Sequence, residues 1–418
     1  MQKKLIVLAI AAMASTSAFA DVTVYGKLDA GYSNTSKTTF DGNGSSTISG
    51  QDAITYSNLS SSRLGVNVTQ DVADGIKAAV KVETGIGSNA MAAVSQTAGT
   101  GTTAPSYATG AGSNIDATSL GNRELNASLI LAGGTTIKAG YGSTLVRDFV
   151  FAYDAASGSF GGNLVGNLLA NDATISSNRK VSVDAIQQFG PLKAVVSVSH
   201  NADYNNATAS TTKGNGYLIG GQYVDGPLSV GAVYQVFDAY TPGTAAVAYK
   251  APTTGNGTTT ISTLGTLAVA AVPATDVQTK ITEVGANYDL GVAKLFAQYA
   301  KVDTADSQDT STLGAATTGT GTRSYESIGI EVPVGAAMIF AQASKGSVNQ
   351  VFTANVAASS RDTSGMTVGA LYSLSKTVTA YAAYGATKLS ADTSTTAMAA
   401  KFTGVNDTQT TAGLVYAF

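Results

Sequence analysis

The sequence contains no cysteine and no tryptophan, and its 418 residues include a single histidine, His200. Without thiols, the chain can have no cysteine nucleophile, disulfide scaffold or cysteine-type zinc site. Charge is also sparse, because Asp, Glu, Lys and Arg make up 12% of the residues against 44% for hydrophobic ones. Acidic residues outnumber basic ones by 27 to 24, so the balance of charge does not favour a nucleic-acid partner.

Residues 1–20 have the composition of a secretory signal peptide. Lys3 and Lys4 precede an unbroken apolar run of ten residues, and Ala18-Phe19-Ala20 has the small-x-small form that signal peptidase cleaves. Ten apolar residues are too few to span a membrane, which takes about 20. We expect residues 21–418 to form the mature, exported protein; loss of the two lysines leaves 22 basic against 27 acidic residues, a net charge of −5.

The mature sequence begins with the alternation that is typical of a β-strand. One face carries Val22, Val24, Gly26, Leu28, Ala30 and Tyr32, and the other carries Thr23, Tyr25, Lys27, Asp29, Gly31 and Ser33. A period of two over about eleven residues matches a tilted strand that crosses a membrane. Similar strands flank short turns rich in Gly, Pro or Asp at Asp71–Gly75, Gly133–Gly134, Gly190–Pro191, Asp225–Pro227, Asp289–Gly291, Pro333–Gly335 and Ser373–Lys376.

Seven such hairpins, an opening strand and a closing strand at Thr410–Phe418 predict sixteen strands. Eight longer connections separate them, at about 34–57, 84–121, 143–178, 201–215, 238–278, 302–322, 345–365 and 386–409. An even number of strands with short turns at one end and long loops at the other is the pattern of an outer-membrane barrel. The predicted fold is all-β: a 16-stranded antiparallel transmembrane β-barrel with short periplasmic turns and long extracellular loops. A soluble β-sandwich, the alternative, does not explain why every second connection is long.

The two predicted faces of the strands differ as a membrane barrel requires. Mid-strand charges fall on the inward face, which avoids the roughly 2–4 kcal/mol that a basic side chain costs at the lipid-facing midplane. Tyrosines favour strand ends on the outward face, where amphipathic rings suit the membrane interface. A barrel of 16 strands leaves a water-filled lumen, so we predict a pore.

The connection 143–178 is far more apolar than the other long ones. It carries Phe149, Phe151, Phe160 and several Leu and Val residues, which need a surface to bury them. We expect this third loop to fold into the lumen and to bring Arg147, Asp148, Asp154 and Asp172 to a constriction; the alternative is packing on neighbouring loops or subunits. A basic wall at mid-height could face it, made of Lys27, Arg63, Lys81, Lys138 and Lys180. Opposed charges across a narrow gap sort permeants by charge, although these residues could instead be solvated lumen charges with no shared role.

Several segments resemble the general porins of Gram-negative bacteria, in particular the neisserial and betaproteobacterial branch. The similarity lies in Val22–Gly31, in Ser62-Arg63-Leu64-Gly65 followed by Gly75–Ala78, and in the aromatic end Gly413–Phe418. The element Gly158-Ser159-Phe160-Gly161-Gly162 resembles a Phe-Gly-Gly element of the family's third loop, although Ser159 stands where an acidic residue is common.

The resemblance implies a homotrimer in the outer membrane, in contact with lipopolysaccharide, whose barrels allow passive diffusion of ions and small hydrophilic solutes. It also implies a third loop folded into the lumen opposite a basic cluster, to whose strands Lys27, Arg63 and Lys81 belong. Tyr416 and Phe418 match the family's carboxyl-terminal assembly signal, which the barrel-assembly machinery reads. We predict no cofactor and no metal site.

Other functions fit the sequence less well. A hydrolase needs a nucleophile and a base, but His200 stands alone and the chain has no Gly-x-Ser-x-Gly elbow. A substrate-selective porin is the main alternative, and a surface receptor or adhesin barrel is another. Although the net charge is negative, the basic mid-height wall favours anions, because the charge nearest the narrowest point decides selectivity.

Overall fold

The computed structural model describes residues 21–40, 46–86, 95–97, 106–108, 121–155, 179–203, 213–241, 253–254, 261–263, 275–305, 319–352, 357–390 and 404–418. The predicted signal peptide, Asp172 and the element Gly158–Gly162 lie outside these residues. Among the residues described, no helix combines the length and apolar character that a membrane crossing needs.

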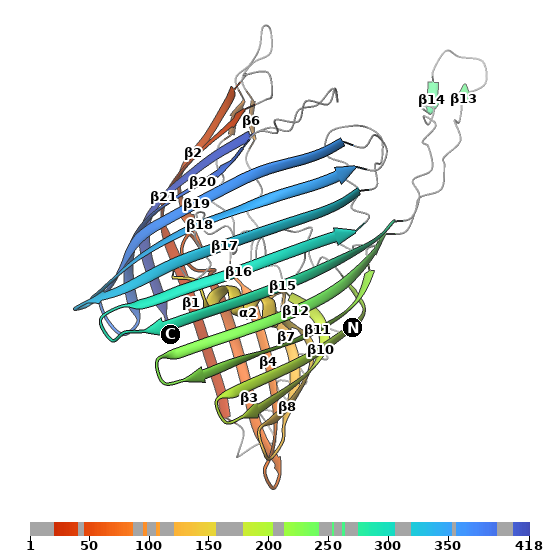
Figure 1. Ribbon diagram of the computed structural model, residues 1–418, viewed down its shortest axis with the longest axis vertical. Coiled ribbons are helices and arrows are strands. Elements are labelled where there is room, and N and C mark those ends of the chain that lie inside the picture. Colours follow the sequence, from red (N-terminus) through yellow and green to blue (C-terminus); the bar gives the residue numbers. More distant parts are fainter. Residues whose placement is uncertain are drawn as a thin grey trace.

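One antiparallel sheet closes on itself to form a barrel (Figure 1). Its strands are β1 (Asp21–Phe40), β2 (Ser46–Tyr56), β3 (Arg63–Ala73), β4 (Ile76–Gly85), β7 (Glu124–Ile130), β8 (Thr135–Ser143), β9 (Arg179–Phe189), β10 (Leu192–Asp203), β11 (Lys213–Asp225), β12 (Leu228–Thr241), β15 (Thr275–Asp289), β16 (Lys294–Ala305), β17 (Gly319–Val334), β18 (Ala337–Phe352), β19 (Ala357–Ser373), β20 (Val378–Leu389) and β21 (Gly404–Ala417). Two small ribbons, β5 (Ser95–Thr97) with β6 (Ser106–Ala108) and β13 (Thr253–Thr254) with β14 (Ile261–Thr263), and one described helix, α2 (Leu145–Ala152), complete the list.

The sheet contains 17 strands but only 16 positions around the barrel, as predicted. The difference arises because β2 and β3 lie end to end along the same edge of β1. The upper part of β1 pairs with β2, starting at Ala30 opposite Tyr56, and its lower part pairs with β3, ending at Lys27 opposite Arg63. The other edge of β1 pairs with β21, which closes the barrel.

The seven predicted tight turns are confirmed, since adjacent strands are paired directly on either side of each one. Gly226 and Gly335 adopt φ of 54° and 60°, the left-handed region that an L side chain rarely occupies. Two predicted loops were wrong in extent. Most of 34–57 is strand, in β1 and β2, and most of 345–365 is strand, in β18 and β19. Ser, Thr and Gly are frequent in both segments, but pairing with neighbouring strands overrides their weak local preference for strand.

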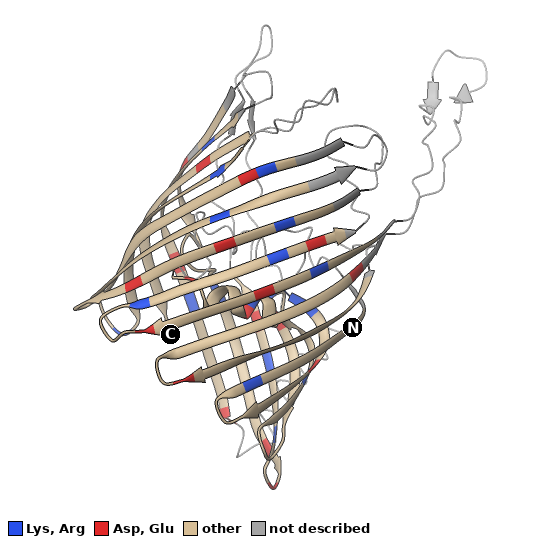
Figure 2. Ribbon diagram, in the orientation of Figure 1, with Lys and Arg blue, Asp and Glu red and all other residues tan. Residues whose placement is uncertain are grey.

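The inner and outer faces have the predicted polarity. On β1, Val24 is 57% exposed on the outer surface, whereas Asp29 on the inner face is fully buried. The large exposed hydrophobic residues recur on the outward parity of the other strands in the same way, and Figure 2 shows only scattered charges on otherwise uncharged strands. The main apolar core is not inside the wall but between the wall and α2, which lies within the barrel (Figure 1).

Candidate functional site

The helix α2 begins the long third connection and has two distinct faces. Thr144 caps its amino terminus, accepting a hydrogen bond on its hydroxyl from the Arg147 N–H at 3.4 Å, and Asp148 lies in the first turn. Leu145, Val146, Phe149 and Val150 form one buried face, because residues three and four apart lie on the same side of a helix. The local sequence therefore specifies an amphipathic helix, where we had predicted only an inward-folding loop.

The apolar face of α2 packs on the inner wall formed by β10, β11, β12 and β15–β18. Inward-facing glycines make room for it: a Cβ at Gly285 would lie 2.1 Å from Cδ2 of Tyr153, and one at Gly231 would lie 2.7 Å from Cζ of Phe149. The carbonyl of Ala152 accepts a hydrogen bond of 2.9 Å from the Asn287 amide. These contacts confirm, for the described part of the loop, that it folds into the lumen.

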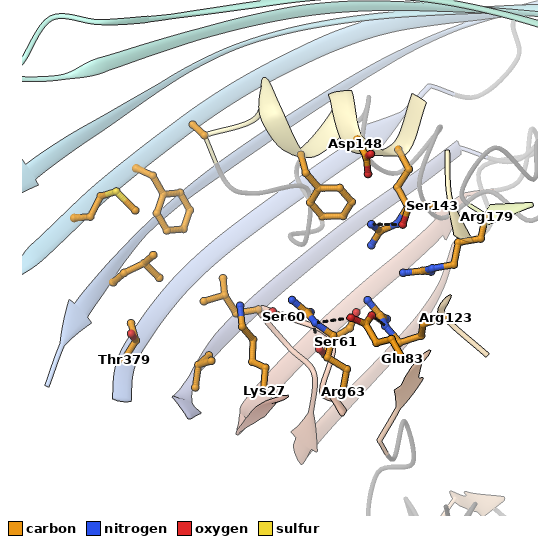
Figure 3. Close-up of a pocket in the computed structure, with 18 of the residues that line it drawn as sticks. Lys27, Ser60, Ser61, Arg63, Glu83, Arg123, Ser143, Asp148, Arg179 and Thr379 are labelled. Carbon is orange, nitrogen blue, oxygen red and sulfur yellow. Dashed lines mark hydrogen bonds and ion pairs between the residues drawn. The ribbon is translucent and has the colours of Figure 1, made fainter. Parts of the chain in front are cut away.

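The opposite face of α2 borders a cavity of about 500 Å³ inside the barrel. Arg147, Asp148 and Phe151 line it from the helix, and strand residues line it from the other side (Figure 3). Six cationic side chains line this cavity, which we call the basic gap: Lys27, Arg63, Lys81, Arg123, Arg147 and Arg179. Two carboxylates, Glu83 and Asp148, are the acidic residues among its described lining.

Glu83 is held by three partners, so its charge is largely compensated. Its Oε1 accepts a hydrogen bond from Nε of Arg123 at 2.6 Å, and its Oε2 lies 3.6 Å from Nε of Arg63 and accepts a 2.9 Å hydrogen bond from the hydroxyl of Tyr25. A carboxylate that is paired with two guanidinium groups fixes them in place as well. The net charge of the gap remains strongly positive.

Two groups on the helix have perturbed acidity. Burial lowers the pKa of Arg147 to about 10, helped by the nearby cations Arg179 and Arg123. Burial raises the pKa of Asp148, against the opposing influence of Arg147 and Lys138. The guanidinium is charged at neutral pH, whereas the carboxyl group becomes neutral sooner on acidification than an ordinary aspartate.

The structure brings together Lys27, Arg63, Lys81, Arg147 and Asp148 from the predicted set and places three others elsewhere. Lys138 is paired with Asp184 at 2.8 Å, within the wall. Lys180 is 5% exposed, with its Nζ 3.3 Å from the centre of the Phe237 ring. Asp154 is buried beyond the end of α2 and does not line the gap. The two lysines face the inside of the barrel from β8 and β9, as predicted, but contacts within the wall hold both side chains away from the gap.

Arg123, Arg179 and Glu83 line the gap but were not predicted as site residues. Arg123 and Arg179 stand at or beside strand ends, next to long connections, where alternation gives no reliable indication of direction. Glu83 follows Lys81 by two residues in β4 and therefore faces inward as well, so the alternation of the strand could have predicted it. Segment 57–62, between β2 and β3, also lines the gap through Leu59, Ser60 and Ser61.

The carboxyl-terminal residues complete the barrel seam. The backbone N–H and carbonyl of Phe418 exchange hydrogen bonds with Gly26 at 3.1 and 2.9 Å. The rings of Tyr416 and Phe418 are stacked with centroids 5.7 Å apart on the outer surface. An aromatic pair at this position is thus exposed to whatever surrounds the barrel.

Comparisons with known proteins agree with this architecture. A family model described as Gram-negative porin matches residues 7–392. Among solved structures, the anion-selective porin from Comamonas acidovorans is 20% identical with a TM-score of 0.60, over 96% of this chain and 100% of that one. The trimer form of OmpT from Vibrio cholerae is 15% identical, with a TM-score of 0.53 over 96% and 100%. Salmonella typhi OmpF, solved with daunomycin, is 14% identical, with a TM-score of 0.53 over 95% and 97%. No curated protein sequence matches the chain significantly.

Proposed function

The chain belongs to the Gram-negative porin family and is an outer-membrane channel for the passive diffusion of solutes, and we propose that its basic gap makes this channel prefer anions. The single observation that carries the proposal is the charge of the gap, in which six cationic side chains face two carboxylates. One of those carboxylates, Glu83, is already paired with arginines.

The physical basis is the local field at the narrowest point. Low-dielectric walls focus the field of fixed charges into an aqueous gap, so that anions are concentrated there and cations are depleted. The Debye length is about 8 Å at physiological ionic strength, so charges that line a gap of this size act on every ion inside it. The similarity of the fold to that of the anion-selective porin from Comamonas acidovorans is consistent with this proposal.

The direct test is a reversal potential in a planar bilayer under a salt gradient of potassium chloride. We expect discrete conductance steps and a potential whose sign reports chloride as the more permeant ion. A potential of the opposite sign would contradict anion preference while leaving the channel in place. Absence of steps from folded protein would contradict the channel itself.

The pH dependence of selectivity follows from the two helix residues. Because the pKa of Asp148 is raised, acidification from pH 7 neutralises this carboxyl group and leaves the cations unchanged, so anion preference should increase. Above about pH 10 the cations of the gap begin to lose their protons, Arg147 among them because burial lowers its pKa to about 10, and anion preference should decrease. Reversal potentials measured at pH 4.5, 7 and 10.5 check both directions. The variant Asp148→Asn should lose part of the acid response; if it keeps the whole of it, Asp148 is not responsible.

Further proposals concern assembly and biogenesis. We propose a homotrimer, which the trimer form of the Vibrio OmpT neighbour supports. We also propose that residues 1–20 are cleaved on export, that Tyr416 and Phe418 present the signal read by the barrel-assembly machinery, and that the outer surface contacts lipopolysaccharide. Solutes pass without chemical change, since diffusion through the gap needs only electrostatic sorting. Mass spectrometry of the mature amino terminus and native electrophoresis test the cleavage and the trimer.

A further inference from the structure

We propose that residues 57–62 form a second constriction element, which we call the serine shelf, and that Asp29 is the residue that positions it. This proposal rests on the channel function and names the part of the wall that, opposite α2, sets the width of the basic gap.

The pairing of β1 shows why the shelf must leave the sheet. Between Lys27, which pairs with Arg63, and Ala30, which pairs with Tyr56, β1 has two residues. Over the same distance the neighbouring chain has six residues, 57–62. The four extra residues cannot lie in the plane of the sheet. The departure begins at Ser57, whose φ of 65° turns the chain out of the strand. Leu59, Ser60 and Ser61 line the cavity, so the surplus folds inward.

Asp29 ties the shelf to the wall. Its Oδ2 accepts hydrogen bonds from the backbone N–H groups of Leu59 and Ser60 at 2.7 and 2.6 Å. Its Oδ1 accepts a hydrogen bond of 2.7 Å from the hydroxyl of Tyr381 on β20. The backbone of Asp29 is used as well, because its carbonyl accepts from Ser57 N–H at 2.9 Å and its N–H donates to Ser62 Oγ at 3.0 Å. A fully buried carboxylate with three donors is an anchor for the segment and is not accessible to permeant ions.

The shelf also orients one of the cations of the gap. Nη1 of Arg63 donates a hydrogen bond of 3.1 Å to the carbonyl of Ser61. In Figure 3 Ser60, Ser61 and Arg63 lie on one side of the opening, and the helix that carries Asp148 lies on the other. Two segments that are not β-strand therefore bound the gap. Displacement of the shelf should change both the width of the gap and the position of Arg63.

Cysteine modification tests the placement of the shelf, because the natural chain has no cysteine to confuse the result. Ser61→Cys should react with a charged methanethiosulfonate reagent added during recording and lose conductance in steps that a reducing agent reverses. The matched control is Ser375→Cys in the exposed turn between β19 and β20, which should react without loss of conductance. If Ser61→Cys is shown by mass to be modified but its conductance is unchanged, the shelf does not line the gap. Absence of current from the cysteine-free parent would instead contradict the channel function.

Two substitutions test whether Asp29 positions the shelf. Asp29→Asn turns one acceptor into a donor while two N–H groups still point at the side chain, so the shelf should be held less firmly. We expect a larger conductance, and a smaller loss of conductance when the cysteine of Ser61→Cys is modified. Tyr381→Phe removes one of the three hydrogen bonds and should give the same changes to a smaller degree. Heat-modifiable mobility on gels confirms that each barrel is folded. Folded variants with unchanged conductance and an unchanged loss of conductance on modification of Ser61→Cys would overturn the role of Asp29. If Asp29→Asn does not fold, Tyr381→Phe still provides the test.

Discussion

Replacement of both Lys27 and Lys81 by glutamate is expected to abolish the preference of the channel for anions. Both side chains line the basic gap, and neither forms an ion pair among the described residues. The double exchange therefore leaves no carboxylate without its partner. Among the described residues that line the gap, it changes six cations and two carboxylates to four of each, which removes their net positive charge.

The size of the effect follows from Coulomb's law. In water a unit charge about 8 Å from an ion contributes roughly 0.5 kcal/mol, and the double exchange alters the gap by four units of charge. Allowing for screening by salt, we expect the ratio of anion to cation permeability to fall by about tenfold or more. Reversal potentials in potassium chloride gradients measure this ratio directly.

The control for this exchange moves the same amount of charge outside the gap. Lys77 and Lys376 are exposed at the periplasmic turns, and their double replacement by glutamate gives the protein the same net charge. We expect this control to change selectivity much less, because Lys77 is four residues along the strand from Lys81, about 13 Å at roughly 3.3 Å per residue, which exceeds a Debye length of about 8 Å. Equal effects of the two double variants would mean that total charge, not the basic gap, determines selectivity.

The barrel could be predicted from the sequence because its main constraint repeats on every strand. Because lipid lies outside and water inside, apolar and polar residues alternate along each strand with a period of two. Gly, Pro or Asp residues mark each tight turn between strands. The third loop was predictable for a related reason: residues such as Phe149 and Val150 need burial, and the inner wall was the concave surface available. Such statements depend on composition and parity, which a single sequence shows directly.

The arrangement of the gap depends on contacts between distant segments, which parity does not report. Lys138 and Lys81 both point inward from their strands. Lys138 forms an ion pair with Asp184 on the neighbouring strand and does not line the gap, whereas Lys81 does. Asp29 resembled a lumen charge, but it is an internal anchor because the chain opposite has four more residues than β1 in that interval. Register and pairing decide such cases, and both are properties of the closed sheet.

A single methyl group added at Gly285 is expected to narrow the channel, because the inner wall at this position is shaped to receive the helix. The Cβ in Gly285→Ala would lie 2.1 Å from Cδ2 and 2.4 Å from Cγ of Tyr153, a fully buried residue at the end of α2. Carbon atoms in contact are about 3.5–4.0 Å apart, so the helix must shift by on the order of 1.5 Å. Strand β15 is held on both edges by its neighbours, and the free space lies toward the gap. We therefore expect single-channel conductance to fall roughly twofold, since Arg147, Asp148 and Phe151 move further into the opening.

The matched control for Gly285→Ala is Gly85→Ala, which adds the same methyl group to a strand beside the gap. There the nearest atom would be Cδ of Arg123 at 3.6 Å, an ordinary contact, so conductance should not change. In a Tyr153→Ala background the nearest remaining atom of residue 153 is its Cβ, 2.9 Å from the added methyl group, so Gly285→Ala should have a much smaller effect than in the parent. Equal conductance losses in both backgrounds would mean that the methyl group acts through the wall and not through the helix. Such a result would also mean that the packing of α2 against the inner wall does not determine the position of one side of the gap.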